Sequence, residues 1–118
     1  MKFMMLLKAD ATSEAGIPPD EKLIVAMGKY NEELVKAGVL LAAEPLFPVQ
    51  TATTVRVRNG QMTVTDGPFA ETKELIAGYA IIQVKSRDEA IEWTKRFLTA
   101  AGEGESEIRQ LHDTPAGP

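Results

Sequence analysis

The residues of this chain that are best suited to chemistry are carboxylates in or beside predicted loops. Glu44 follows an apolar run, Asp66 ends an alternating run, and Glu71 and Glu74 come soon after it. Paired carboxylates can transfer protons as general acid and base, or can hold a hard cation such as Mg²⁺. Acidic residues in loops are more often simply solvated, so both interpretations stay open.

Three other side chains could contact a ligand beside these carboxylates. Arg56 has a guanidinium group that could clamp a carboxylate ligand, although such residues more often solubilise an exposed ribbon or pair across a dimer. Lys73 could anchor an anionic substrate or form a plain ion pair. Tyr79 follows Gly78, where a close backbone approach is allowed, and could be a core residue or extend its hydroxyl into a cleft.

The sequence excludes several kinds of site through residues that it lacks. It has no cysteine, which excludes a disulfide framework, a Cys-ligated zinc, an iron–sulfur cluster and a thiol nucleophile. Its single histidine, His112, cannot form a multi-His metal site within one chain. No nucleotide-binding motif is present, and we expect no cofactor.

Length and charge bound the class of protein. The 118 residues fit one domain, which we place at residues 1–112, followed by a frayed tail at 113–118. The 17 acidic against 13 basic side chains argue against binding to nucleic acid, because phosphate backbones are bound by a basic excess. The apolar runs are shorter than a membrane span needs and no signal peptide is evident, so we expect a cytoplasmic protein.

Hydrophobic spacing and turn residues predict six strands and two helices. Asp20 and Gly38 bound the first helix, and Ser86 begins a capping box ahead of a second helix that ends at Gly102. Pro45 follows the second apolar run and indicates a bend or a sheet edge. The predicted strands cover residues 2–8, 39–43, 53–58, 61–65, 75–84 and 105–111.

The strongest local signal is the turn Asn59-Gly60 between two alternating runs. This pair favours a type I′ turn and therefore a β-hairpin. The turn fixes the pairing register, opposes Arg58 to Gln61, and places the apolar residues of the hairpin on one face. These apolar residues are Val55, Val57, Met62 and Val64.

Asp66 has the same parity as those apolar residues, so its carboxylate faces the apolar side if the strand continues that far. One interpretation is that it accepts backbone N–H bonds from the turn that follows at residues 67–69. The other is a desolvated carboxylate at the mouth of a cleft that acts as a general acid or base. The two interpretations are not exclusive.

Without the hairpin, the elements run β-α-β-β-α-β, which is the ferredoxin-like arrangement of the α+β class. The helices would cover one face of an antiparallel sheet. The strands carry apolar residues on both faces, so the second face also needs a cover. We therefore predict a homodimer formed through the open sheet face.

The stretch DGPFAETKE at residues 66–74 resembles the signature of the DGPF-motif proteins, a branch of the YCII-related superfamily. Further resemblance spans most of the chain, at residues 33–41, 55–58, 90–93, 103–105 and 107–109. It implies a dimeric α/β barrel made from two ferredoxin-like subunits.

The resemblance implies less about activity, because most of these bacterial proteins are uncharacterised. YCII-like relatives are proposed enzymes with a His–Asp pair in a cleft, some act on chlorinated hydroxyquinols, and a fold neighbour isomerises muconolactones. Some DGPF proteins are encoded beside sigma factors of the extracytoplasmic-function type. Here the Asp corresponds to Asp66, but no His lies near it. Ala43-Glu44-Pro45 also stands where near relatives have Gly-Glu-Gly.

Two classes of function remain open. The first is a protein that binds a small molecule and performs lyase-type or isomerase-type acid–base chemistry on a small polar ring compound. Asp66 would be its acid or base and Glu44 the partner. The second is a non-catalytic interaction or sensor module in a stress or sigma-factor pathway, which the missing His and the acidic charge favour. In the first class, the substrate contacts would be Arg56, Glu71, Lys73 and Tyr79.

Overall fold

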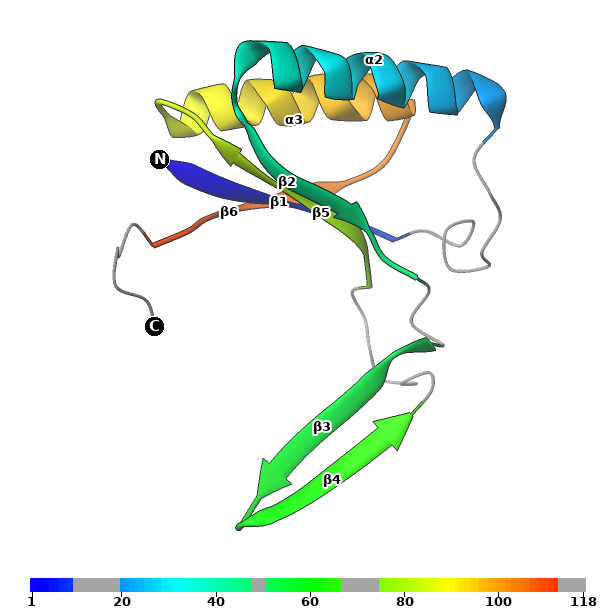
Figure 1. Cartoon of the computed structure of the whole chain (residues 1–118), viewed down its shortest axis with the longest axis vertical. Coiled ribbons are helices and arrows are strands. Elements are labelled where there is room, and N and C mark those ends of the chain that lie inside the picture. Colours follow the sequence, from blue (N-terminus) through cyan, green and yellow to red (C-terminus); the bar gives the residue numbers. More distant parts are fainter. Residues whose placement is uncertain (10–19, 48–50, 67–74, 113–118) are drawn as a thin grey trace.

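The structure, a computed structural model, describes residues 1–9, 20–47, 51–66 and 75–112. Within these residues it is a mixed α+β fold with two helices and six strands, all paired antiparallel (Figure 1). The predicted tail at 113–118 lies outside the described residues. The elements are β1 (Lys2–Lys8), α2 (Glu21–Ala37), β2 (Leu40–Pro45), β3 (Thr53–Arg58), β4 (Gln61–Asp66), β5 (Ile76–Gln83), α3 (Arg87–Ala101) and β6 (Ser106–Gln110).

Four of the strands form one sheet in the order β2-β5-β1-β6. Both helices lie side by side on one face of this sheet, and in Figure 1 its other face has no helix over it. The apolar strands β1 and β5 take the two central positions, which fits their content of apolar residues on both faces. The prediction of an α+β fold with two helices is confirmed.

The second strand differs in its limits from the predicted range of 39–43. It begins at Leu40 and continues through Pro45, which pairs with Gly78 of β5. Proline is tolerated there because β2 is an edge strand, so its missing N–H breaks no ladder on the outer side. The predicted sheet edge is therefore confirmed, whereas the strand does not end before Pro45.

The helix ends form at the predicted positions, and Asp20, predicted as a negative charge at the start of the first helix, also caps it. Asp20 accepts a hydrogen bond from the Leu23 N–H at 2.8 Å, and Ser86 accepts one from the Glu89 N–H at 3.1 Å. Gly38 ends α2 with a φ of 71°, in the left-handed region that glycine enters without steric cost. These caps fix where each helix starts and stops above the sheet.

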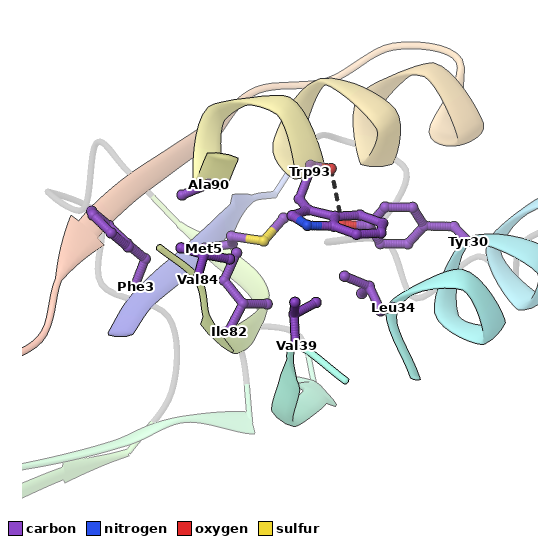
Figure 2. Close-up of a cluster of buried hydrophobic side chains, with 9 residues drawn as sticks. All are labelled: Phe3, Met5, Tyr30, Leu34, Val39, Ile82, Val84, Ala90 and Trp93. Atoms are coloured by element: carbon purple, nitrogen blue, oxygen red, sulfur yellow. Dashed lines mark hydrogen bonds between the residues drawn. The ribbon is translucent and has the colours of Figure 1, made fainter. Parts of the chain in front are cut away.

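A single apolar core joins the helices to the sheet (Figure 2). Tyr30 of α2 contacts Trp93 of α3 edge to face, with ring centroids 6.3 Å apart, and its hydroxyl donates a 3.0 Å hydrogen bond to the Trp93 carbonyl. Leu34 and Ile82 are the largest fully buried side chains, one from α2 and one from β5. The core members are Phe3, Met5, Tyr30, Leu34, Val39, Ile82, Val84, Ala90 and Trp93.

The hairpin forms with the predicted register and turn. Arg58 pairs with Gln61, and Val57 pairs with Met62. Asn59 and Gly60 have φ values of 52° and 78°, as a type I′ turn requires at both positions. The strands β3 and β4 form a separate two-stranded sheet that extends away from the main sheet, on the side opposite the helices (Figure 1).

Candidate functional site

A cavity of about 320 Å³ lies between the helices and the main sheet. The rings of Tyr30 and Phe97 are among its lining on the helix side and pack edge to face, with centroids 5.5 Å apart. The sheet side offers small residues, namely Ala43, Gly78 and Ala80. Because these side chains are short, the space beneath the two aromatic rings stays open.

Gly78 is required by the close approach of β2 to β5. A Cβ atom at this position would lie 3.0 Å from the Glu44 carbonyl oxygen and 3.2 Å from the Pro45 Cα, both of which are backbone atoms. Backbone atoms cannot rotate away, so any larger residue would push the edge strand outward. Gly78 therefore keeps β2 in place and leaves the cavity unfilled.

Two hydroxyl groups in the cavity lining already have backbone partners. Ser106 donates to the Leu6 carbonyl at 3.2 Å, and Tyr30 donates to the Trp93 carbonyl. Burial raises the pKa of Tyr30 to about 12, with Arg96 lowering it and Glu33 raising it to smaller extents. Tyr30 therefore stays protonated near neutral pH and serves as a structural donor.

Glu44 and Tyr79, two of the predicted site residues, are direct neighbours across the β2–β5 ladder. Side chains alternate along strands, so both point to the sheet face opposite that of Ala43 and Ala80. Both residues are also among the lining of the cavity, although these side chains point away from the helices. The Glu44 side chain is exposed and Tyr79 is half-buried, which places a carboxylate and a phenol together at the margin of the sheet.

Asp66 is the last residue of β4, and it pairs with Thr53 at the start of β3. The Thr53 hydroxyl donates a 2.7 Å hydrogen bond to Asp66 Oδ1, and the Asp66 side chain is exposed in the single chain. The predicted turn at 67–69 lies outside the described residues. Thr53 was missing from the sequence prediction, although extension of the hairpin register by five pairs from Arg58–Gln61 would have found it.

Arg56 lies on the polar face of the hairpin, as predicted. The space of about 290 Å³ beside it is lined by Arg56, Arg58, Asn59, Gln61 and Thr63, all from the hairpin itself. Neither Asp66 nor Arg56 is among the residues that line the cavity under the helices.

The chain was compared with known protein families over its full length. A family described as the YCII-related domain matches residues 1–113, which is almost the entire chain. The chain belongs to the YCII-related family. An uncharacterised protein of Rhizobium meliloti is 36% identical over 93 residues, which cover 78% of this chain and 75% of that protein.

A solved structure resembles this YCII-related chain in fold. It is the 5-chloro-2-hydroxyhydroquinone dehydrochlorinase of Burkholderia phenoliruptrix, in complex with 2,5-dihydroxybenzoquinone. The TM-score is 0.54 at 17% sequence identity, and the match covers 95% of this chain and 94% of the other. At this identity the likeness concerns the fold.

The candidate residues of this YCII-related chain fall into two groups. Glu44 and Tyr79 lie together on the main sheet, whereas Asp66 and Arg56 lie on the hairpin. The predicted contacts Glu71 and Lys73 lie outside the described residues. Across residues 1–9, 20–47, 51–66 and 75–112, no three acidic, His or Cys side chains group as metal ligands. No helix in this described part is long and apolar enough to cross a membrane.

Proposed function

We propose that this YCII-related chain binds a small ring compound in the cavity between its helices and its sheet. The cavity itself is the observation that carries this proposal. Its volume of about 320 Å³ lies within the roughly 300–1,000 Å³ of ligand pockets in proteins. Its lining is mostly apolar, with a few polar groups that could orient a ligand, as such pockets usually have.

The ligand class follows from the residues that line the cavity. The rings of Tyr30 and Phe97 and the side chain of Met27 suit the apolar faces of a ring, and Asn31 suits a polar group at its edge. A dihydroxylated quinone such as the ligand of the structural neighbour is a compound of this kind. The proposal extends to that class of compound.

We further propose acid–base chemistry at the open face of the sheet, to which Glu44 and Tyr79 point. Glu44 would take or give the proton there, with the phenol of Tyr79 beside it. Asp66 and Arg56 form the second group of proposed site residues, and Glu71 and Lys73 remain proposed substrate contacts. A reaction of the lyase or isomerase type needs only such a proton transfer from the protein.

Titration calorimetry with 2,5-dihydroxybenzoquinone tests the binding site. Ala43→Leu places a larger side chain in the lining at an edge strand, where the fold tolerates it, and should weaken binding at least tenfold. Ala42→Leu is the matched control, because Ala42 is the next residue but points to the opposite face of the sheet. Equal affinity for the two variants would place the ligand elsewhere, and absence of binding by the wild type would end the proposal.

The acid–base role has its own test. Glu44→Gln keeps the size of the side chain and removes its charge, so turnover of any ring compound found to bind should fall by about 10²-fold or more. Binding of that compound should change little. Glu92→Gln, at an exposed position of α3, controls for the loss of one negative charge. Unchanged turnover in Glu44→Gln would exclude Glu44 as the acid or base.

We also propose that two copies pair through the open face of the main sheet. The strand order β2-β5-β1-β6 supports a ferredoxin-like subunit, with the inserted hairpin set aside. The register gives the open face an apolar centre, formed by the half-buried side chains of Met4, Leu6, Tyr79 and Ile81. Sedimentation velocity should find a dimer at micromolar concentration, and Met4→Lys should convert it to monomer.

The exposed apolar residues of the hairpin favour the alternative function of an interaction module. In that case the hairpin would be the surface that recognises the partner.

A further inference from the structure

The hairpin presents a continuous apolar surface to solvent. Its apolar residues share one face by register and belong to both strands. Val55 and Val57 are each 61% exposed, Met62 is 69% exposed and Val64 is 66% exposed. The apolar core between helices and sheet is buried by contrast. Contiguous apolar surface of this kind marks an interaction site in a stable protein. We call these residues the hairpin stripe: Val55, Val57, Met62 and Val64.

The shape of the chain shows that the stripe is not covered by its own subunit. The radius of gyration is 16.4 Å, whereas a compact domain of this length has about 13.5 Å. The excess comes from the hairpin, which extends from the main sheet on the side opposite the helices (Figure 1). A second subunit seated on the open sheet face would therefore lie on the same side as the hairpin.

We propose that the hairpin is an arm that packs its stripe against a second copy of this chain, which packs its own arm in return. The proposal rests on the dimer suggested above and is independent of the ring-compound site. Such an exchange is self-complementary, because a two-fold axis makes each copy both donor and acceptor of an arm.

The area that a stable dimer needs favours this occupant. At about 3.4 Å per residue and 4.8 Å per strand, the open sheet face offers a footprint on the order of 400 Å². One face of the hairpin offers on the order of 200 Å² more, and an equal area receives the partner's arm. With both arms engaged, the flat footprint doubles to on the order of 800 Å² per partner, which is enough for a standard interface that buries about 800 Å² of accessible surface per partner.

Two adjacent substitutions on β4 test the arm. Val64→Lys places a charge in the stripe, whereas Thr63→Lys places the same charge on the polar face of the same strand. In sedimentation velocity, Val64→Lys should raise the dissociation constant of the dimer at least tenfold, and Thr63→Lys should leave it within about twofold. Equal effects of the two variants would overturn the proposal.

Crosslinking adds a direct measurement, because the chain has no cysteine and a single one can be introduced cleanly. Val57→Cys carrying a thiol-linked photoactivatable group should give a covalent dimer in the purified protein. Thr54→Cys, whose side chain points to the other face, should give little. A dimer that Met4→Lys abolishes but that Val57→Cys does not crosslink would refute the arm and leave the sheet interface standing. A wild type that stays monomeric would refute both.

Discussion

The Thr53 hydroxyl donates a 2.7 Å hydrogen bond to the Asp66 carboxylate across the first pair of the hairpin ladder. This contact joins the base of β3 to the end of β4, at the first residue of the stretch that resembles the DGPF signature. A hydrogen bond to a charged acceptor is stronger than one between neutral groups. Asp66 thus has a structural role, and a test of its chemical role must separate the two effects.

Thr53→Val should loosen the base of the hairpin and leave the rest of the fold intact. It keeps the shape of the side chain and removes the donor, which costs about 1 kcal/mol at this site. Backbone amides of the hairpin should exchange with solvent about fivefold faster, while the urea midpoint of the whole chain changes little, because the hairpin is separate from the core. Native-state hydrogen exchange measures the difference.

The control is Thr54→Val, since Thr54 faces Thr65 and not a carboxylate. If both valine variants speed exchange equally, the hydrogen bond to Asp66 contributes nothing specific. Comparison with Asp66→Asn then separates the chemical role from the structural one. If Asp66→Asn lowers turnover and Thr53→Val does not, the Asp66 carboxylate has a chemical role.

Gly78→Ala and Gly28→Ala should shift stability in opposite directions. An added Cβ at Gly78 would meet the backbone of β2 at 3.0 Å, so we expect a loss of about 1–3 kcal/mol and weaker binding of a ring compound. An added Cβ at Gly28, inside α2, meets nothing within 4 Å. Alanine is the better helix former there, which should add up to about 1 kcal/mol.

Urea unfolding of both variants measures these changes. A Gly78→Ala protein as stable as the wild type would show that β2 can move away from β5 at little cost. A Gly28→Ala protein that is destabilised would show that α2 has a neighbour at this position in the assembled protein.

The hairpin was predictable from sequence because its information is local. Asn59-Gly60 sets the turn, the turn sets the register, and the register sets the faces. The same reasoning predicts the helix ends, since each cap is a contact between residues three apart. The limit of β2 at Pro45 depends instead on its position at the sheet edge, which local patterns do not contain.

The candidate site was less predictable because it depends on contacts between distant residues. Glu44 and Tyr79 meet only because β2 pairs with β5, and no turn connects those strands. The cavity arises from small residues on the sheet that lie opposite two aromatic rings on different helices, a coincidence of packing. Composition alone could not group them, nor could it show that Asp66 and Arg56 lie on a separate sheet.

Tyr30 should make the stability of this chain depend on pH above 10. Its hydroxyl is buried against the Trp93 carbonyl, and burial raises the pKa from 10.0 to about 12. The unfolded chain therefore releases this proton at lower pH than the folded chain does. The stabilisation is fully present below pH 10 and is lost as the pH rises through about 12, by an amount on the order of 2 kcal/mol.

Tyr30→Phe isolates this contribution. At neutral pH it should cost about 1 kcal/mol, because the hydrogen bond from the Tyr30 hydroxyl is lost while the Trp93 carbonyl keeps its place in the helical ladder of α3. Between pH 10 and 12 the wild type loses the Tyr30 contribution and the variant has none to lose, so the difference between their urea midpoints should narrow. A difference that stays constant over this range would show that the phenol is not shielded from water.

The absorbance of tyrosinate gives a direct measurement. The chain has two tyrosines, so in Tyr79→Phe this absorbance comes from Tyr30 alone, and its pH titration should have a midpoint near 12.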